Sequence, residues 1–379
     1  MTPAFRLLAA CCRWPNDDAR ATAIWAAASG FDDWDELARL TDRHRVEPLV
    51  VHGLAAAGLA VPPALAAAAD RHRSAGVRDL AETLRIAAAL DAAGIKHRFL
   101  KGAPLGVAAY GTPFLKRSWD VDLLVLPADA VAAAALLAER GYAPDMPPRP
   151  LDREEYARWS KVSKEAELRS PRGTVIELHW RVSDHPALLP SIDAATPARC
   201  IPLLGDHRVA TLADDANLAY LAVHGTAHAW SRIKWIADFN ALLQSIDPGD
   251  RPTMLHRARQ FGTGHAIEAA LSLLGCLFRS SDDSAYPAPA SPLTRFALDA
   301  LASDDQSEIE RSGKRARWRL GSGPLFIVRE ATIRLRGTRD RELHPLSSGW
   351  QWLYPVLRIT FWIARRFQGN GETDGTGKR

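Results

Sequence analysis

The sequence has little of what would place it in a specialised class. Its 379 residues include only four cysteines (Cys11, Cys12, Cys200 and Cys276) and no C-x-x-C motif, so neither a disulfide framework nor a structural zinc site is expected. Few cysteines fit a reducing compartment, and we expect the cytoplasm. The formal net charge is only +4, so the composition makes a nucleic-acid partner unlikely. A hydrophobic fraction of 47% and a charged fraction of 24% exclude disordered, collagen-like and coiled-coil chains.

Long hydrophobic runs are also missing, so we expect no transmembrane segment. The N-terminus has a short apolar run with one early cation and a Trp-Pro soon after, which does not favour a secretory signal. The nearest approach to a membrane segment is 350–367, which Pro355, Arg358 and the Arg365–Arg366 pair interrupt. It is either a buried aromatic helix or an amphipathic helix that makes peripheral membrane contact.

Hydrophobic periodicity divides the chain into helical flanks and one α/β unit, which predicts the α+β class: a small mixed-sheet core flanked by N-terminal and C-terminal α-helical regions. The expected regions are an α-helical N-terminal region (1–92), the α/β core (93–183), an α-helical region (184–300), a basic and aromatic helical C-terminal region (301–368) and a disordered tail (369–379).

Within the core, short apolar runs alternate with helical patterns. Strands are expected at 95–100 and 121–126, helices at 103–110 and 128–140, and a hairpin from 166–169 and 174–181 around a Ser-Pro-Arg-Gly turn. The segment 144–150 is expected to be a proline-rich surface loop.

Two aspartates in the second strand point to metal chemistry. Asp120 and Asp122 are two residues apart, so both side chains project from one face of a strand. Two neighbouring carboxylates repel each other unless a cation lies between them, and carboxylate oxygens suit Mg²⁺. Glu177, within an apolar strand, is the expected third acid. The alternative is an exposed edge strand with ordinary surface acids.

Basic residues and a glycine surround the acids. Lys101 and Gly102 end a strand and open a helix, whose N-terminal N–H groups can bind phosphate. Lys116 and Arg117 precede the acids and are expected to neutralise triphosphate charge, unless they form a solvated basic turn.

Three further candidates are expected near the nucleotide. His179 shares the strand face of Glu177. His224 and His228 lie four residues apart on one helix face, a spacing that suits polar contacts or structural roles more than a metal because no glutamate lies between them. Lys234 follows in the next element, where an amphipathic surface helix is the alternative interpretation.

The order of these motifs resembles the uncharacterised bacterial nucleotidyltransferase family of the DNA polymerase β-like superfamily. The resemblance covers 94–182, from Lys-Gly through D-V-D-L-L-V to E-L-H-W, and extends more loosely to 221–238. It implies that Asp120, Asp122 and Glu177 hold Mg²⁺ or Mn²⁺ for catalysis. Gly102 takes the place of the superfamily's Gly-Ser.

The resemblance implies a magnesium-dependent nucleotidyltransferase. Such an enzyme transfers an NMP group from an NTP to an unidentified acceptor (a small molecule, sugar, peptide or protein) and releases pyrophosphate. The alternatives are a catalytically impaired nucleotide-binding regulatory module or, less expected, an RNA-directed transferase that uses the basic segment 308–343.

Overall fold

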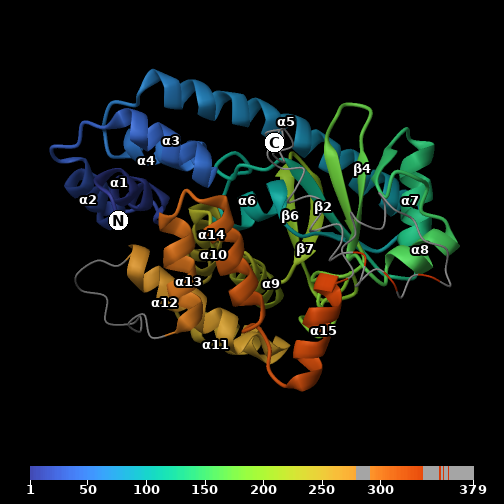
Figure 1. Cartoon of the computed structure of the whole chain (residues 1–379). Helices are drawn as coiled ribbons and strands as arrows, with labels where there is room; N and C mark the ends of the chain where they lie inside the picture. Colours follow the sequence, from blue (N-terminus) through green and yellow to red (C-terminus); the bar gives the residue numbers. More distant parts are fainter. Residues whose placement is uncertain (279–290, 336–349, 351–352, 354–356, 358–379) are drawn as a thin grey trace, which may run out of the picture.

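The computed structural model describes residues 1–278, 291–335, 350, 353 and 357, and its centre is one seven-stranded sheet (Figure 1). The order across the sheet is β3-β4-β5-β2-β1-β7-β6. The strands are β1 (His97–Phe99), β2 (Asp120–Val125), β3 (Ala143–Met146), β4 (Glu165–Arg169), β5 (Val175–His179), β6 (Ala198–Leu204) and β7 (His207–Leu212).

The sheet is mixed, as predicted. Strand β2 runs parallel to β5 and antiparallel to β1, and β1 runs parallel to β7. Val121, Leu123 and Val125 alternate with the polar positions of β2 and are all buried. The α+β class is therefore confirmed, and the core strands fall close to their expected positions.

Three strands correct the sequence-based expectations. The hairpin β6–β7 lies inside the range 184–300 that was expected to be helical, and β7 joins the sheet through its parallel pairing with β1. Strand β6 is an edge strand that buries only alternate residues such as Ile201 and Leu203, so its apolar signal is weak. Strand β3 overlaps the first residues of the expected loop 144–150; it is the other edge strand, where proline is tolerated. The region boundaries themselves stay a prediction.

The N-terminal region is helical, as the alanine-rich pattern indicates. Its helices are α1 (Pro3–Cys12), α2 (Asp18–Ala28), α3 (Trp34–His44), α4 (Glu47–Ala56) and α5 (Pro63–Ala92). Figure 1 shows α1–α4 grouped beside one end of the long α5, whose other end reaches the sheet. Leu80, Ile86 and Leu90 of α5 are buried there, so α5 connects the N-terminal helices with the sheet.

The remaining helices surround the sheet, and several of those that follow it in the chain lie below it in Figure 1. They are α6 (Gly102–Tyr110), α7 (Ala130–Glu139), α8 (Arg153–Trp159), α9 (Asp214–Ala227), α10 (Ile233–Ser245), α11 (Arg251–Ala258), a π-helical turn (Arg259–Thr263), α12 (Gly264–Phe278), α13 (Pro292–Ala302), α14 (Gln306–Arg317) and α15 (Pro324–Leu335).

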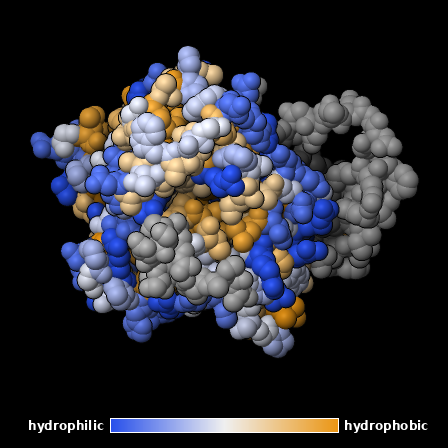
Figure 2. Space-filling view, turned by 90° about the vertical axis from the view of Figure 1, so that its left-hand side faces the viewer, coloured by the Kyte–Doolittle hydropathy of each residue, from blue (hydrophilic) through white to orange (hydrophobic). Residues whose placement is uncertain are grey.

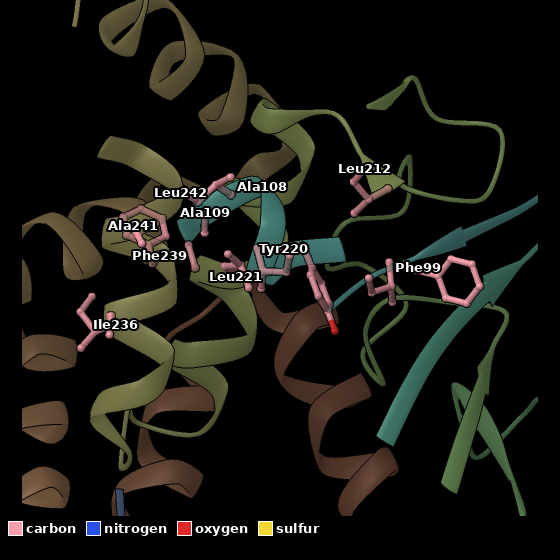
Figure 3. Close-up of a cluster of buried hydrophobic side chains, with 14 of the residues drawn as sticks. Phe99, Ala108, Ala109, Leu212, Tyr220, Leu221, Ile236, Phe239, Ala241 and Leu242 are labelled. Carbon is pink, nitrogen blue, oxygen red and sulfur yellow. The ribbon is translucent and has the colours of Figure 1, made fainter. Parts of the chain in front are cut away.

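One apolar cluster joins the sheet to α6, α9 and α10 (Figure 3). Its labelled members are Phe99 of β1, Leu212 of β7, Ala108 and Ala109 of α6, Tyr220 and Leu221 of α9, and Ile236, Phe239, Ala241 and Leu242 of α10. All of these side chains are buried. Because packed interiors resist deformation, the polar residues at the ends of these elements are held in fixed relative positions.

The turn between α9 and α10 is unusually tight. Ala229 and Trp230 both have positive φ (49° and 48°), and the Trp230 ring packs directly against Gly225. A Cβ at position 225 would lie only 2.3 Å from the ring, so glycine is required there. This turn determines where α10 begins.

The side of the molecule that lies to the left in Figure 1 has a mostly hydrophilic rim and a hydrophobic area in a central hollow (Figure 2). Large apolar side chains are exposed elsewhere too, for example Leu325 and Val328 on α15.

Within the described residues, one helical stretch, Arg251–Phe278, is long and apolar enough to span a membrane. However, 44% of its apolar window is buried, and core helices pass the same test. The segment 350–367 and the tail 369–379 lie almost entirely outside the described residues.

The glycine at the α9–α10 turn yields a stability prediction. We expect Gly225→Ala to lower the free energy of unfolding by about 2 kcal/mol or more, because the new methyl group overlaps a buried ring. Urea titration checks this. As a control, alanine replaces Gly264, a helical glycine with open space around its Cβ position, and stability should be retained. Equal effects of the two substitutions would contradict the packing argument.

Asp79 of α5 yields a pH prediction. Burial raises the pKa of Asp79 to about 6 from an ordinary 3.8, although Thr174 donates a hydrogen bond to it. Folding favours the protonated carboxyl of Asp79. Its contribution to the free energy of unfolding is therefore complete at a pH below the pKa of the unfolded chain, and it is lost as pH rises through about 6. In metal-free buffer, Asp79→Asn should therefore raise the melting temperature above about pH 6, and this gain should disappear toward pH 4. A gain independent of pH would contradict this cause.

Candidate active site on the sheet

The acidic face arises from the pairing of β2 with β5. In this parallel pair Asp122 lies opposite Glu177, and Leu124 lies opposite His179. Since alternate residues share a face, the side chains of Asp120 and Asp122 project to the same side of the sheet as those of Glu177 and His179. The expectation that the acids of two separate strands converge on one face is confirmed for Asp122 and Glu177.

Asp122, Glu177 and His179 form a group that could hold a cation. Their ligand atoms all lie within 4.8 Å of one another. Nε2 of His179 lies 3.4 Å from Oδ1 of Asp122 and 3.3 Å from Oε2 of Glu177. Oδ2 of Asp122 and Nε2 of His179 are buried without a hydrogen-bond partner among the described residues. Buried polar atoms without partners are costly, so this group suits an additional ligand such as a divalent cation.

Charge on this face is balanced by cations from two sides. Burial alone would raise the pKa of Asp122, but Lys101 and His179 outweigh burial and hold it well below its usual range. Burial and Lys164 oppose the charge of His179, yet the carboxylates of Glu165, Asp122 and Glu177 raise its pKa. In the absence of metal, His179 and Lys101 therefore help to compensate the charge of the acids.

Asp120 lies at the edge of this group rather than inside it. It does not belong to the groups of three potential ligands within the described residues. Burial, followed by the repulsion of Asp122 and Glu177, raises the pKa of Asp120. The proposed metal role of Asp120 stays a prediction, as do the catalytic roles of Asp122 and Glu177.

Lys101 and Gly102 lie where strand β1 passes into α6. Gly102 has φ 61°, a conformation that side-chain-bearing residues rarely adopt, and α6 has no side-chain cap at its N-terminus. Nζ of Lys101 lies 2.9 Å from Oδ1 of Asp122 and 5.6 Å from the centre of the Tyr220 ring. The uncapped N–H groups of α6 thus open beside the acids, which suits an anion.

Strand β4 adds two acids that the sequence analysis missed. Glu167 pairs with Glu177 and Glu165 pairs with His179 across β4 and β5, and Glu165, Glu167 and Glu177 form a second group of close oxygens. Glu165 is compensated by an ion pair with Lys164. The alternation Glu165-Ala166-Glu167 is the same i, i+2 signal as in Asp120-Val121-Asp122, and it could have revealed these residues.

The two basic residues ahead of the acids have partners within the fold. Arg117 pairs with Asp42 Oδ1 at 3.1 Å and with the buried carboxylate of Glu47. Nζ of Lys116 lies 3.4 Å from Oδ2 of Asp238. Arg117 is buried, so it does not belong to a solvated turn: its guanidinium joins the segment ahead of β2 to the N-terminal helices. The expected contact of Lys116 and Arg117 with a triphosphate stays a prediction.

His224 and His228 lie in an aromatic cluster at the end of α9. Their ring centres are 4.8 Å apart, and both pack against Trp235 at 5.6 and 5.2 Å. Burial and then Lys101 lower the pKa of His224. Neither histidine belongs to a potential metal group within the described residues. Their expected roles near the nucleotide stay a prediction. Lys234 lies near Asp120, whose pKa it lowers.

A cleft of about 1090 Å³ opens beside the acidic face. Its walls come from β4, from the α9–α10 turn and from α14 and α15. The wall residues include Glu165, Glu167, His228, Ser231, Arg232, Trp235, Lys314, Arg317 and Arg334. This cleft offers both acidic and basic groups to a substrate that reaches the sheet.

The fold and the site define an α+β protein with a candidate cation site on the face of a mixed sheet. Residues 31–279, more than half of the chain, match a family of uncharacterised nucleotidyltransferases, so the chain belongs to that family. The protein is therefore a transferase whose substrate is a nucleotide, and the resemblance noted in the sequence is confirmed. No curated protein matches the chain.

The ion pair of Arg117 yields a further prediction. We expect Arg117→Met to lower the free energy of unfolding by about 3 kcal/mol, because Glu47 is left buried with His72 as its remaining ion-pair partner among the described residues. Adding Glu47→Gln should recover most of this loss, and denaturant titration of both single variants and the double variant measures the coupling. A fully stable Arg117→Met that loses nucleotide affinity would instead assign Arg117 to the phosphates.

Proposed function

We propose that this enzyme transfers an NMP group from an NTP to an acceptor hydroxyl and releases pyrophosphate, with Mg²⁺ or Mn²⁺ as the required cation. The observation that supports this most directly is the pairing of Asp122 with Glu177 on adjacent parallel strands, with Oδ2 of Asp122 buried and unpartnered. In the balanced reaction the acceptor oxygen bonds to the α-phosphorus as the bond from phosphorus to pyrophosphate breaks.

The residues present fit a divalent cation. Asp122 and Glu177 offer oxygens and His179 offers a nitrogen within one small group, and Asp120 lies beside it. When bound, the cation would withdraw charge from the phosphates and lower the pKa of the acceptor hydroxyl. Binding of the cation also requires His179 to lose its proton if Nε2 is to be a ligand.

The other residues position the substrate. The N–H groups at the start of α6 face the acids and can bind phosphate oxygens, and Gly102 permits the backbone turn that this requires. Lys101 can exchange its contact with Asp122 for a phosphate oxygen once the cation neutralises that carboxylate. The cleft lined by Glu165, Trp235 and Arg317 is large enough for a sugar, a peptide segment or another small acceptor.

A second candidate function has one specific observation in its favour. Lys101 occupies Oδ1 of Asp122, where a cation-dependent enzyme would have a metal. A nucleotide-binding regulatory module would keep this internal ion pair and bind nucleotide without turnover.

The two functions differ in pyrophosphate release. With Mg²⁺ or Mn²⁺, each labelled NTP and a panel of acceptors, the wild type should release pyrophosphate. Asp122→Asn and Glu177→Gln should reduce the rate at least about a hundredfold, because each removes a charge at the cation. Asp145→Asn, which alters an exposed strand acid paired with Arg169, should leave the rate unchanged.

The regulatory module predicts a different pattern. It would bind NTP as tightly as an enzyme does, but all four proteins would give the same background of pyrophosphate. Direct titration with Mn²⁺ adds a readout independent of turnover, since Asp122→Asn should weaken Mn²⁺ binding under either function. Unchanged Mn²⁺ affinity in that variant would contradict the cation site itself.

A further inference from the structure

Three basic side chains next to the acidic face have no ion-pair partner among the described residues: Arg45, Arg232 and Lys234. Arg45 ends α3, Arg232 precedes α10, and Lys234 lies in the first turn of α10. The backbone N–H of Ile233 donates to Nδ1 of His44 at 3.3 Å, which joins the end of α3 to the start of α10. Residues far apart in the sequence thus form one cationic cluster.

The carboxylates near this cluster that form ion pairs do so with other basic residues. Arg117 and Lys116 lie close by, but their carboxylate partners are Asp42, Glu47 and Asp238. The Trp119 ring packs against both Arg45 and Arg117, with centroid distances of 5.8 and 4.5 Å.

The pKa shifts show that this charge is costly. Burial, then Arg232 and Arg117, lower the pKa of Arg45 to about 10. Burial, then Lys116 and Arg45, lower the pKa of Lys234 to about 7, against the attraction of Asp238 and Asp120. Burial and mutual repulsion thus disfavour the charged forms of Arg45 and Lys234, which form no ion pair with the described residues.

The backbone around the cluster is strained at Arg45 and adds positive potential at the start of α10. Arg45 has φ 58°, the left-handed conformation in which glycine usually ends a helix. An arginine there costs backbone energy that a glycine would not. Helix α10 has thirteen residues, no acidic side chain in its first turn and no side-chain cap, so its N-terminus adds further positive potential.

The position of the cluster indicates its ligand. Asp120 attracts both Arg45 and Lys234, and it is repelled by Asp122 and Glu177, so it links the cluster to the acidic group. A ligand that spans the two regions needs one phosphate at the acids and further negative charge at the cluster. The polyphosphate chain of a nucleotide has this distribution of charge.

We propose that Arg45, Arg232 and Lys234 form the binding site for the β- and γ-phosphates of the NTP, the pyrophosphate that leaves. This inference rests on the proposed function and extends it, because Arg45 belongs to the N-terminal helices and not to the sheet. Those helices thereby complete the substrate site, and the three cations neutralise charge that develops on the leaving group.

The test is calorimetric titration of the metal-free chain with inorganic tripolyphosphate, below about pH 7 so that Lys234 is charged. Arg45→Gly, Arg232→Met and Lys234→Met should each weaken binding about tenfold or more, the effect of one charge-assisted contact. The controls Arg71→Met and Lys161→Met remove exposed basic residues elsewhere and should bind like the wild type. Wild-type affinity in the three cluster variants, or equal losses in the controls, would overturn the proposal.

Thermal stability separates a binding role from a structural one. Without ligand, Arg45→Gly and Lys234→Met should melt at or above the wild-type temperature, because each relieves backbone strain or like-charge repulsion. Tripolyphosphate should raise the melting temperature of the wild type more than that of either variant. Lower intrinsic stability of both variants, with an undiminished shift by tripolyphosphate, would show a structural role and overturn the proposal.

Two comparisons identify the source of the phosphate and keep the proposals distinguishable. Tripolyphosphate and ATP should bind far more tightly than orthophosphate; equal, cluster-dependent binding of orthophosphate would indicate a phosphorylated acceptor and overturn the inference. Cluster-dependent tripolyphosphate binding without any pyrophosphate release from NTP would preserve the inference and refute the proposed activity. Pyrophosphate release with unchanged KM for NTP in the cluster variants would support the proposed activity and refute the inference.

Discussion

Asp122 and Glu177 lie side by side on neighbouring parallel strands, where burial gives their repulsion little screening by solvent. Much of the surrounding structure compensates that repulsion. Lys101 contacts Asp122 from the start of α6. His179, two residues after Glu177 on the same face of β5, contacts both acids. The compensation is incomplete, since Oδ2 of Asp122 has no partner in the described part of the chain. An incompletely satisfied acidic group of this kind is stable in a fold that receives a cation from solution.

The helical flanks have a role in this balance of charge. The N-terminal helices provide Asp42 and Glu47, which neutralise Arg117 beside the acidic strand, and they also provide Arg45, which forms no ion pair with the described residues. The tight α9–α10 turn, with Trp230 against Gly225, determines where Arg232 and Lys234 lie. Cations and acids thus form two separate groups, both of which interact with Asp120. Such separation suits a reaction in which one phosphate is attacked and two others depart.

Membership of a nucleotidyltransferase family gives the class of reaction, and the shape of the site shows how the rest of the substrate could be accommodated. The cleft beside β4 has acidic residues on the sheet side and basic residues on α14 and α15. Residues that follow the sheet in sequence therefore contribute to the same opening as the strands.

The sequence by itself determined the acidic strand Asp120–Val125, the helix that begins at Gly102 and the strand of Glu177 and His179, because alternation and glycine punctuation are local signals. It also determined the α+β class. Only the tertiary structure decided that β6 and β7 extend the sheet, that Arg117 pairs with Glu47, and that Glu165 and Glu167 face Glu177. Strand register, ion-pair partners and the meeting of α3 with α10 depend on contacts between segments far apart in the chain. Periodicity reports which face of an element is apolar, but it carries no information about which element lies opposite.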